Sequence, residues 1–210
     1  MMDELTAKIG KALADKLDGF KFVKSQWHLI RKTEVGSQSI VIEVLPTSDP
    51  ETAKLAAHGH VRIDEIEDAY TPHNPYLTPK DAKAHPTIVV NCDQLLSDKS
   101  LANGFRVDEQ SINQFVDVYA RALEGDVLPW LNKYSDEGNL FENLSSEDPK
   151  SWITSDRLIR YPVLLAMLAK KENWARFEQI GEEFLNYCDQ PHAQVYKPLA
   201  ASVIEGLKGV

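Results

Sequence analysis

The spacing of hydrophobic and polar positions changes near residue 107 and divides the chain into two halves. Residues 20–107 hold short β-branched and aromatic runs with partial alternation, a pattern typical of strands. Residues 108–210 instead repeat apolar residues at three- and four-residue spacing, which predicts amphipathic helices. Strands followed by helices favour an antiparallel sheet with the helices segregated to one face or end. We therefore predict the α+β class.

The strand-rich half should begin with a helix. A one-sided apolar stripe over residues 3–18 predicts that helix, and Gly19 follows it where a helix end favours glycine. Strands are expected at about residues 20–32, 39–45, 60–66 and 87–92, with a short extension at 104–107. The continuous apolarity of the second strand favours a central position. The expected fold is a four- or five-stranded, mainly antiparallel sheet with an N-terminal helix and a helical C-terminal half.

A proline-rich segment interrupts the strands. Residues 71–86 contain four prolines, which cannot donate the hydrogen bonds that a central strand needs. We expect a long, polar surface loop there. Such loops in compact domains are often functional. The acidic run before it, at residues 64–68, is expected to be a solvated strand end.

The helix-rich half opens on the cleanest helical stripe in the chain. Asp108 stands at the expected N-cap, and Phe115 and Tyr119 lie on the apolar stripe, so both aromatic rings should pack against the sheet. Further helices are expected at about residues 140–144, 155–170, 172–188 and 193–208. The third of these is expected to bury Trp174, Phe177, Ile180 and Phe184.

A polar link over residues 145–151 marks the expected division of the chain. We expect an α+β domain over residues 1–145 and a helical extension over 146–210, packed on the same domain.

The net charge of -9 is concentrated in the second half, where it is -7 against -2 in residues 1–107. A negative field repels phosphate backbones, so a duplex nucleic acid partner is not expected. A basic protein partner would be steered toward such a surface. The alternative is that the charge serves solubility alone.

The two cysteines and the length of the apolar runs indicate the cellular compartment in which the protein is expected. Cys92 and Cys188 are the only cysteines and look like small core hydrophobes, which fits a reducing compartment. The first residues lack the basic-then-apolar pattern of a secretory signal. No apolar run approaches the ~18 residues of a membrane span. We expect a cytoplasmic protein without a membrane partner.

Motifs for catalysis are missing from the sequence. It contains no GxSxG elbow, no glycine-rich phosphate loop, and no HExxH or CxxC pair. Cys92 could pair with His85 or His58 as nucleophile and base, but it ends an apolar strand, where a core role is favoured. The sequence leaves the question of an enzyme open and favours a protein that is not one, and we expect no cofactor.

A histidine pair supplies the rival interpretation. His58 and His60 stand two residues apart on an expected strand, so they share a face, and His28 could add a third ligand. Zinc sites need three or four ligands, which this pair alone does not provide. An enzyme, or a metal- or small-ligand-binding protein, using the sheet face at His28, His58 and His60 is the alternative.

Four residues are candidates for contact with a partner. Glu178, Glu182 and Glu183 stand within about one helical turn of their neighbours and could form one negative face. Trp152 lies beside Pro149 in a polar connector, where a tryptophan either fills the core or anchors a partner. These residues would contact a basic protein.

Part of the chain resembles a family of small bacterial proteins of unknown function. The resemblance rests on a helix, a Gly-Phe step into a strand, and a strand written around Gln-Ser, and covers about residues 5–145. The matching positions are Leu17-Asp18-Gly19-Phe20-Lys21, Trp27, Arg31, the run from Gln38 to Val44 and the run from Asp126 to Tyr134. Some members are proposed immunity proteins of polymorphic toxin systems, so the resemblance implies a bacterial, non-enzymatic binding module.

Overall fold

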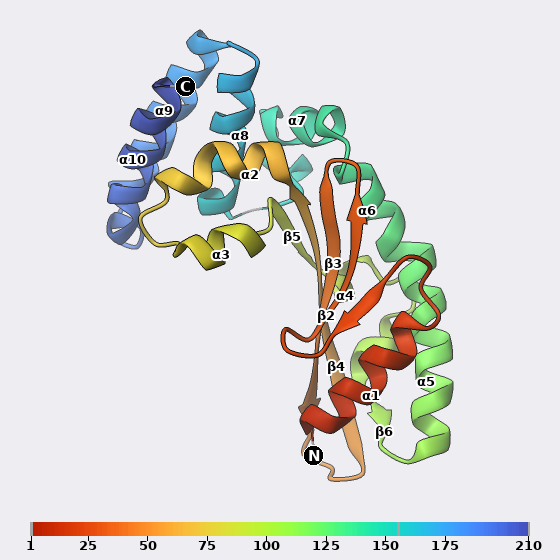
Figure 1. Ribbon diagram of the computed structural model, residues 1–210. Coiled ribbons are helices and arrows are strands. Elements are labelled where there is room, and N and C mark those ends of the chain that lie inside the picture. The colour runs from red at the N-terminus through yellow and green to blue at the C-terminus, as the bar shows by residue number, and fades with distance from the viewer. Residues whose placement is uncertain (1, 155, 210) are drawn as a thin grey trace. The chain divides into compact units, whose positions relative to one another are not determined.

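The chain forms two compact units, each discontinuous in sequence. The computed structural model describes residues 2–154 and 156–209 (Figure 1). The sheet unit comprises Met1–Val61 and Val89–Ser135, and the helical unit comprises Arg62–Ile88 and Asp136–Val210. The predicted α+β class is confirmed, with an N-terminal helix, an antiparallel sheet and a helical C-terminal half. The expected division at residues 145 and 146 does not coincide with these units, because residues 62–88 cluster with the C-terminal helices.

The sheet has six strands in the order β1-β2-β3-β4-β5, with β6 paired to β4. β3 lies between β2 and β4 and is buried over its first five residues, so the predicted central position is confirmed. The pairs β1–β2, β2–β3 and β4–β6 are antiparallel. The strands are β1 (Lys21–Val23), β2 (His28–Thr33), β3 (Gly36–Pro46), β4 (Thr52–Ile63), β5 (Ile88–Asn91) and β6 (Phe105–Arg106).

Two strand predictions were wrong in their extent. The expected strand at 20–32 is the hairpin β1–β2, and Trp27 stands in its turn with φ 55°, in the left-handed region. The expected strand at 60–66 begins eight residues earlier than predicted, at Thr52, and ends at Ile63. The acidic run that follows starts helix α2 (Asp64–Tyr70), because acidic side chains favour the first turn of a helix.

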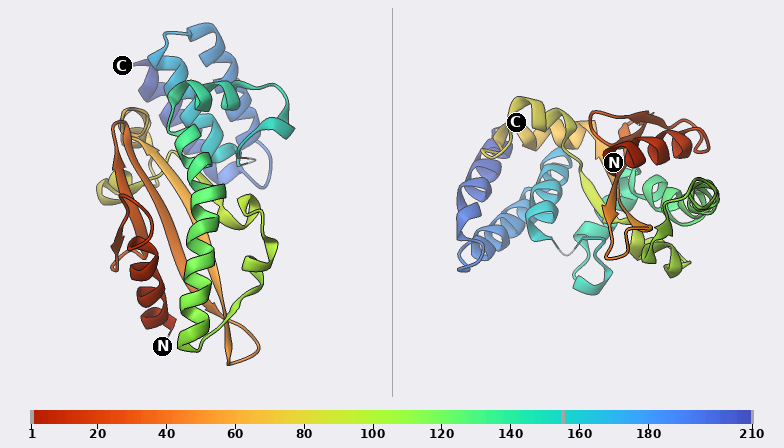
Figure 2. Two further views of the ribbon diagram at one scale, coloured as in Figure 1. Left: turned by 90° about the vertical axis from the view of Figure 1, so that its right-hand side faces the viewer. Right: turned by 90° about the horizontal axis from the view of Figure 1, so that it is seen from below.

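Two helices complete the core of the sheet unit. In α1 (Met2–Ala14), the hydroxyl of Thr6 accepts a hydrogen bond of 3.1 Å from the backbone N–H of Val44 in β3. Helix α5 (Glu109–Ala122) has Asp108 as its N-cap, as predicted, with the carboxylate accepting from the N–H of Ser111. Figure 2 shows α5 lying alongside the strands. Phe115 and Tyr119 are buried on its inner face, which confirms that prediction.

The helical path continues past α5 and through Pro129. A π-helical turn, η3 (Leu123–Val127), leads into α6 (Leu128–Tyr134). Pro129 falls in the first turn of α6, directly after the π-helical turn. The sheet unit also contains α4 (Cys92–Leu95) and η2 (Lys99–Asn103).

The helical unit contains the helices predicted for the end of the chain. Its elements besides α2 are η1 (Thr71–His73), α3 (Pro79–Ala84), α7 (Glu137–Ser145), η4 (Pro149–Ser151), α8 (Arg157–Lys170), α9 (Trp174–Cys188), η5 (Gln194–Tyr196) and α10 (Lys197–Lys208). Helix α8 is buried from Arg160 to Leu168 and runs through Pro162. It is the central helix of this unit.

The proline-rich segment is not the plain loop that its composition predicts. It contains η1 and α3, and its side chains pack on the C-terminal helices. The hydroxyl of Tyr76 donates a hydrogen bond to the carbonyl oxygen of Val195, and its ring meets that of Tyr196 edge-on at 6.1 Å. A Cβ on Gly206 would overlap the ring of His73, so the glycine permits the close approach of that ring to α10.

A buried polar cluster holds the same segment against α2. The side chain of Glu67 is fully buried, and its Oε2 lies 2.9 Å from Nδ1 of His85. The guanidinium of Arg62 donates to the carbonyl oxygens of Ala82 at 2.8 Å and His85 at 2.9 Å, and to Oδ1 of Asp64 at 2.7 Å. These bonds join α2 to α3 and explain why the segment is ordered.

Candidate functional site

The structure brings together two of the three histidines proposed as ligands. The rings of His28 and His60 lie edge-on with centroids 6.1 Å apart, whereas His58 is exposed. Burial lowers the pKa of His28. Within residues 2–154 and 156–209, no group of three or more histidine, cysteine or carboxylate side chains is placed to hold a metal ion. The geometry therefore gives the metal-binding alternative no complete ligand set.

Cys92 does not have the properties of a nucleophile. Its side chain is fully buried at the start of α4, and burial raises the pKa of its thiol to about 12. The thiol is therefore protonated at neutral pH, whereas nucleophilic attack needs the thiolate.

The buried thiol predicts a loss of stability in alkali. The folded-state pKa of Cys92, about 12, lies above its ordinary value of 9. The contribution of the protonated thiol to the free energy of unfolding is therefore fully present below pH 9. It is lost as pH rises toward 12, at up to about 1.4 kcal/mol per pH unit. Urea denaturation between pH 8 and 10 should show this slope, and Cys92→Ala should make it shallower. Equal slopes in the two proteins would contradict the prediction.

The structure separates the three glutamates proposed to form one acidic face. Glu178 and Glu182 are exposed on α9, four residues apart on one side of the helix. Glu183 is half-buried and accepts a hydrogen bond of 3.3 Å from Nε2 of Gln179. Successive residues on a helix point about 100° apart, so the side chain of Glu183 points away from that of Glu182. It lines a hollow that Trp152 also lines.

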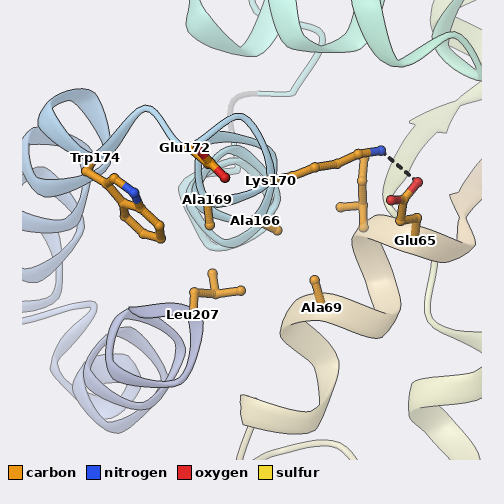
Figure 3. Close-up of a pocket in the computed structure, with 9 residues that line it drawn as sticks. Glu65, Ala69, Ala166, Ala169, Lys170, Glu172, Trp174 and Leu207 are labelled. Carbon is orange, nitrogen blue, oxygen red and sulfur yellow. Dashed lines mark hydrogen bonds and ion pairs between the residues drawn. The ribbon is translucent and has the colours of Figure 1, made fainter. Parts of the chain in front are cut away.

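A second hollow lies among four helices of the helical unit (Figure 3). It has a volume of about 370 Å³, and we call it the Trp174 hollow. Helices α2, α8 and α10 supply its walls, and the start of α9 supplies Trp174. Its lining residues are Glu65, Ile66, Ala69, Ala166, Ala169, Lys170, Glu172, Trp174 and Leu207.

Small side chains create the hollow. Ala69 on α2 and Ala166 and Ala169 on α8 leave space where larger residues would fill the gap between helices. Leu207 of α10 faces the same space, and the indole of Trp174 extends toward it (Figure 3). The surface offered is apolar and concave, with an aromatic ring at its edge.

Trp174 is 42% exposed, so the prediction that α9 buries it was wrong. Phe177, Ile180 and Phe184 are fully buried, as predicted. Trp174 is the first residue of α9, and its ring meets that of Phe177 edge-on at 5.5 Å. Its position on the periodic stripe indicated burial, but a stripe does not tell whether a neighbouring helix covers its end.

A fixed cation stands at the rim of the hollow. Nζ of Lys170 lies 2.7 Å from Glu65 and 3.0 Å from Glu137. Partial burial lowers the pKa of Lys170, but the hydrogen bonds to the two carboxylates outweigh this effect and raise it overall. The ammonium is therefore held in place, with acidic groups around it.

The backbone is strained at the same rim. Glu172 has φ 53°, in the left-handed region that favours glycine. The N–H groups of Glu172 and Asn173 donate to the carbonyl oxygens of Ala169 at 2.9 Å and Leu168 at 3.0 Å, the helix-ending pattern whose left-handed position is usually glycine. A glutamate there keeps a carboxylate beside Trp174.

No described helix is long and apolar enough to cross a membrane. Comparison with family models, curated proteins and solved structures found no match to this chain.

Proposed function

We propose that this chain is a non-enzymatic protein-binding module whose Trp174 hollow receives an apolar side chain of a basic protein partner. One observation carries the proposal: a 42% exposed indole beside an alanine-lined hollow with a charged rim. Protein interfaces concentrate their binding energy in this arrangement, in which an aromatic residue and a desolvated pocket are surrounded by polar groups.

The charges beside the hollow favour a basic partner over an acidic one. Trp174, Glu178 and Glu182 are spaced four residues apart along one exposed side of α9, and Glu172 adds a carboxylate at the rim. The Lys170 ammonium is neutralised by Glu65 and Glu137. Lysine or arginine residues flanking the partner's apolar side chain would therefore meet carboxylates that form no ion pair with another described residue, and such carboxylates steer association.

An immunity-like role would be one form of this binding. The resemblance of residues 5–145 implies a bacterial protein that binds a toxin and blocks it, which fits a cytoplasmic binder of a basic protein. The bacterial setting, the toxin partner and the cytoplasmic location rest on that resemblance and on the sequence, and are part of the proposal.

Trp174→Ala should weaken partner binding strongly. A partner captured from the native extract and then purified would be titrated against wild type and variant. Loss of a central aromatic anchor costs about 2 kcal/mol or more, so the dissociation constant should rise about thirtyfold. The matched control is Val118→Ala, because Val118 is exposed to a similar extent, 40%, on α5 of the sheet unit. The control should bind as wild type does.

Charge reversal tests whether the carboxylates of α9 steer the partner to its binding site. Glu178→Lys with Glu182→Lys should slow association, and the difference from wild type should nearly vanish at about 1 M salt, where the screening length is about 3 Å. An acidic partner, or an association rate indifferent to salt and to these reversals, would contradict the proposed charge complementarity. Undiminished binding by Trp174→Ala would contradict the proposed anchor.

A further inference from the structure

The hollow that Trp152 and Glu183 line in the helical unit also has three arginines in its wall. It has a volume of about 420 Å³ and shares no lining residue with the Trp174 hollow. Arg157 and Arg160 come from α8, and Arg176 comes from α9. Trp152 and Tyr187 add aromatic rings to the wall. We call this hollow the arginine pocket.

The arginines of this pocket lie beyond ion-pair distance of the described carboxylates, although the charge of Glu183 still acts on Arg160. Among the described residues, no ion pair joins a carboxylate to Arg157, Arg160 or Arg176. Arg160 is only 3% exposed, and its Nε has no hydrogen-bond partner in the described part of the chain. Arginine is almost never fully buried unless it is paired, because burying an uncompensated charge costs several kcal/mol. The pocket therefore offers guanidinium groups to which an anion could bind.

Stacking on aromatic rings orients the guanidinium groups. The guanidinium carbon of Arg160 lies 3.9 Å from the ring centroid of Trp152, and that of Arg157 lies 5.3 Å from the ring centroid of Tyr187. The Trp152 ring is itself fixed, because its Nε1–H donates to the carbonyl oxygen of Ser146 at 2.7 Å. A stacked guanidinium keeps its N–H groups at its edge, where they can still donate. The donors are therefore held in place before any ligand arrives.

The third arginine is positioned by a neutral group. Nη1 of Arg176 donates to Oε1 of Gln179 at 2.6 Å, and Gln179 in turn donates to Glu183. Glu147 and Glu183 are the only carboxylates among the described lining residues. Three guanidinium groups against two carboxylates make the pocket locally positive in a chain of net charge -9. General attraction for anions is thus weak, and selectivity must come from the pocket itself.

We propose that the arginine pocket binds a phosphate group, either as free phosphate or carried on a small molecule. A carboxylate is satisfied by one guanidinium fork, whereas a phosphate offers oxygens to several donors at once. Burial, together with the positive charges of Arg157 and Arg176, lowers the pKa of Arg160, and a bound dianion would relieve both effects. The volume leaves room for a carrier beside the phosphate.

Calorimetric titration of the full chain at low ionic strength tests the proposal. The probes are inorganic phosphate, phenyl phosphate and benzoate, the last a carboxylate on the same ring. Both phosphate probes should bind one to a chain and more tightly than benzoate. Tighter binding of phenyl phosphate would identify a carried phosphate as the ligand, and equal affinities would identify free phosphate.

Variants assign the binding to the pocket. Arg157→Gln and Arg176→Gln should each raise the dissociation constant about tenfold, because charge-assisted hydrogen bonds are lost. Arg160→Lys keeps the charge but loses the planar fork and should weaken binding similarly. Glu183→Gln should tighten binding, which a purely structural role of Glu183 would not predict. The control Arg121→Gln, at an exposed position on α5, should bind as wild type does.

Three results would overturn the proposal. These are no binding of either phosphate probe at about 10 mM, tighter binding of benzoate, and equal losses in Arg121→Gln and the pocket variants. Trp174→Ala should leave phosphate binding unchanged, so failure of the proposed protein-binding site would not disturb this test.

Discussion

Phe115→Ala is expected to lower the free energy of unfolding of the sheet unit by about 3–5 kcal/mol, the usual range for emptying a buried aromatic site. The ring of Phe115 is 8% exposed and is stacked between Phe105 at 4.3 Å and Tyr119 at 5.2 Å. Its removal would leave a void between α5 and β6 that neither neighbouring ring can fill without changing its own rotamer. Urea denaturation of wild type and variant measures the loss.

Val118→Ala is the matched control for this prediction. Val118 lies on the same helix as Phe115, but it is 40% exposed. Its truncation should change the free energy of unfolding by about 0.5 kcal/mol or less, as for most surface positions. A loss below about 1 kcal/mol in Phe115→Ala would mean that the inner face of α5 does not support the core.

The regular parts of the fold could be predicted because their periodicity was sustained. Helix α5 shows this most clearly, since its N-cap Asp108 and its apolar stripe both identify it. The strand at residues 20–32 failed because the sequence of its turn, Lys24 to Trp27, has neither glycine nor proline. Trp27 takes the left-handed conformation that glycine usually takes, so no local signal marked the turn.

The sequence did not indicate which residues far apart along the chain pack together. The acidic run at 64–68 looked solvated, yet Glu67 within it is fully buried beside Arg62 and beside His85, which lies 18 residues further along the chain. The proline-rich segment also lacked any local sign of order. Its structure depends on partners such as Val195, Tyr196 and Gly206, more than a hundred residues away.

The candidate sites were foreseen only in part. Trp152 and Glu183 were singled out from the sequence, and both line the arginine pocket, but the three arginines were not recognised as a group. The spacing of Arg157 and Arg160, three residues apart on one helix, was the signal available. The Trp174 hollow had no such signal, because alanines on separate helices form a cavity only once the helices pack.

Arg62→Met is expected to destabilise the helical unit by about 3–5 kcal/mol, the usual cost of removing one partner from a buried ion pair. The variant retains the length of the side chain but removes the donors to the carbonyl oxygens of Ala82 and His85. It also removes the positive charge whose Nη1 lies 4.0 Å from Oε2 of Glu67. The fully buried carboxylate would then depend on His85, while its Oε1 already has no hydrogen-bond partner among the described residues.

Hydrogen exchange of the amides in residues 62–88 should be faster in Arg62→Met than in wild type. Two further variants test whether the lost stability comes from the ion pair with Glu67. Lys170→Met removes a partly exposed ion pair with Glu65 and Glu137, and should cost about 1 kcal/mol or less because solvent screens such pairs. Glu67→Gln in the Arg62→Met background should recover part of the loss, since it removes the charge that Arg62 had compensated. If Arg62→Met costs no more than Lys170→Met, or if Glu67→Gln recovers nothing, the burial of Glu67 does not depend on Arg62.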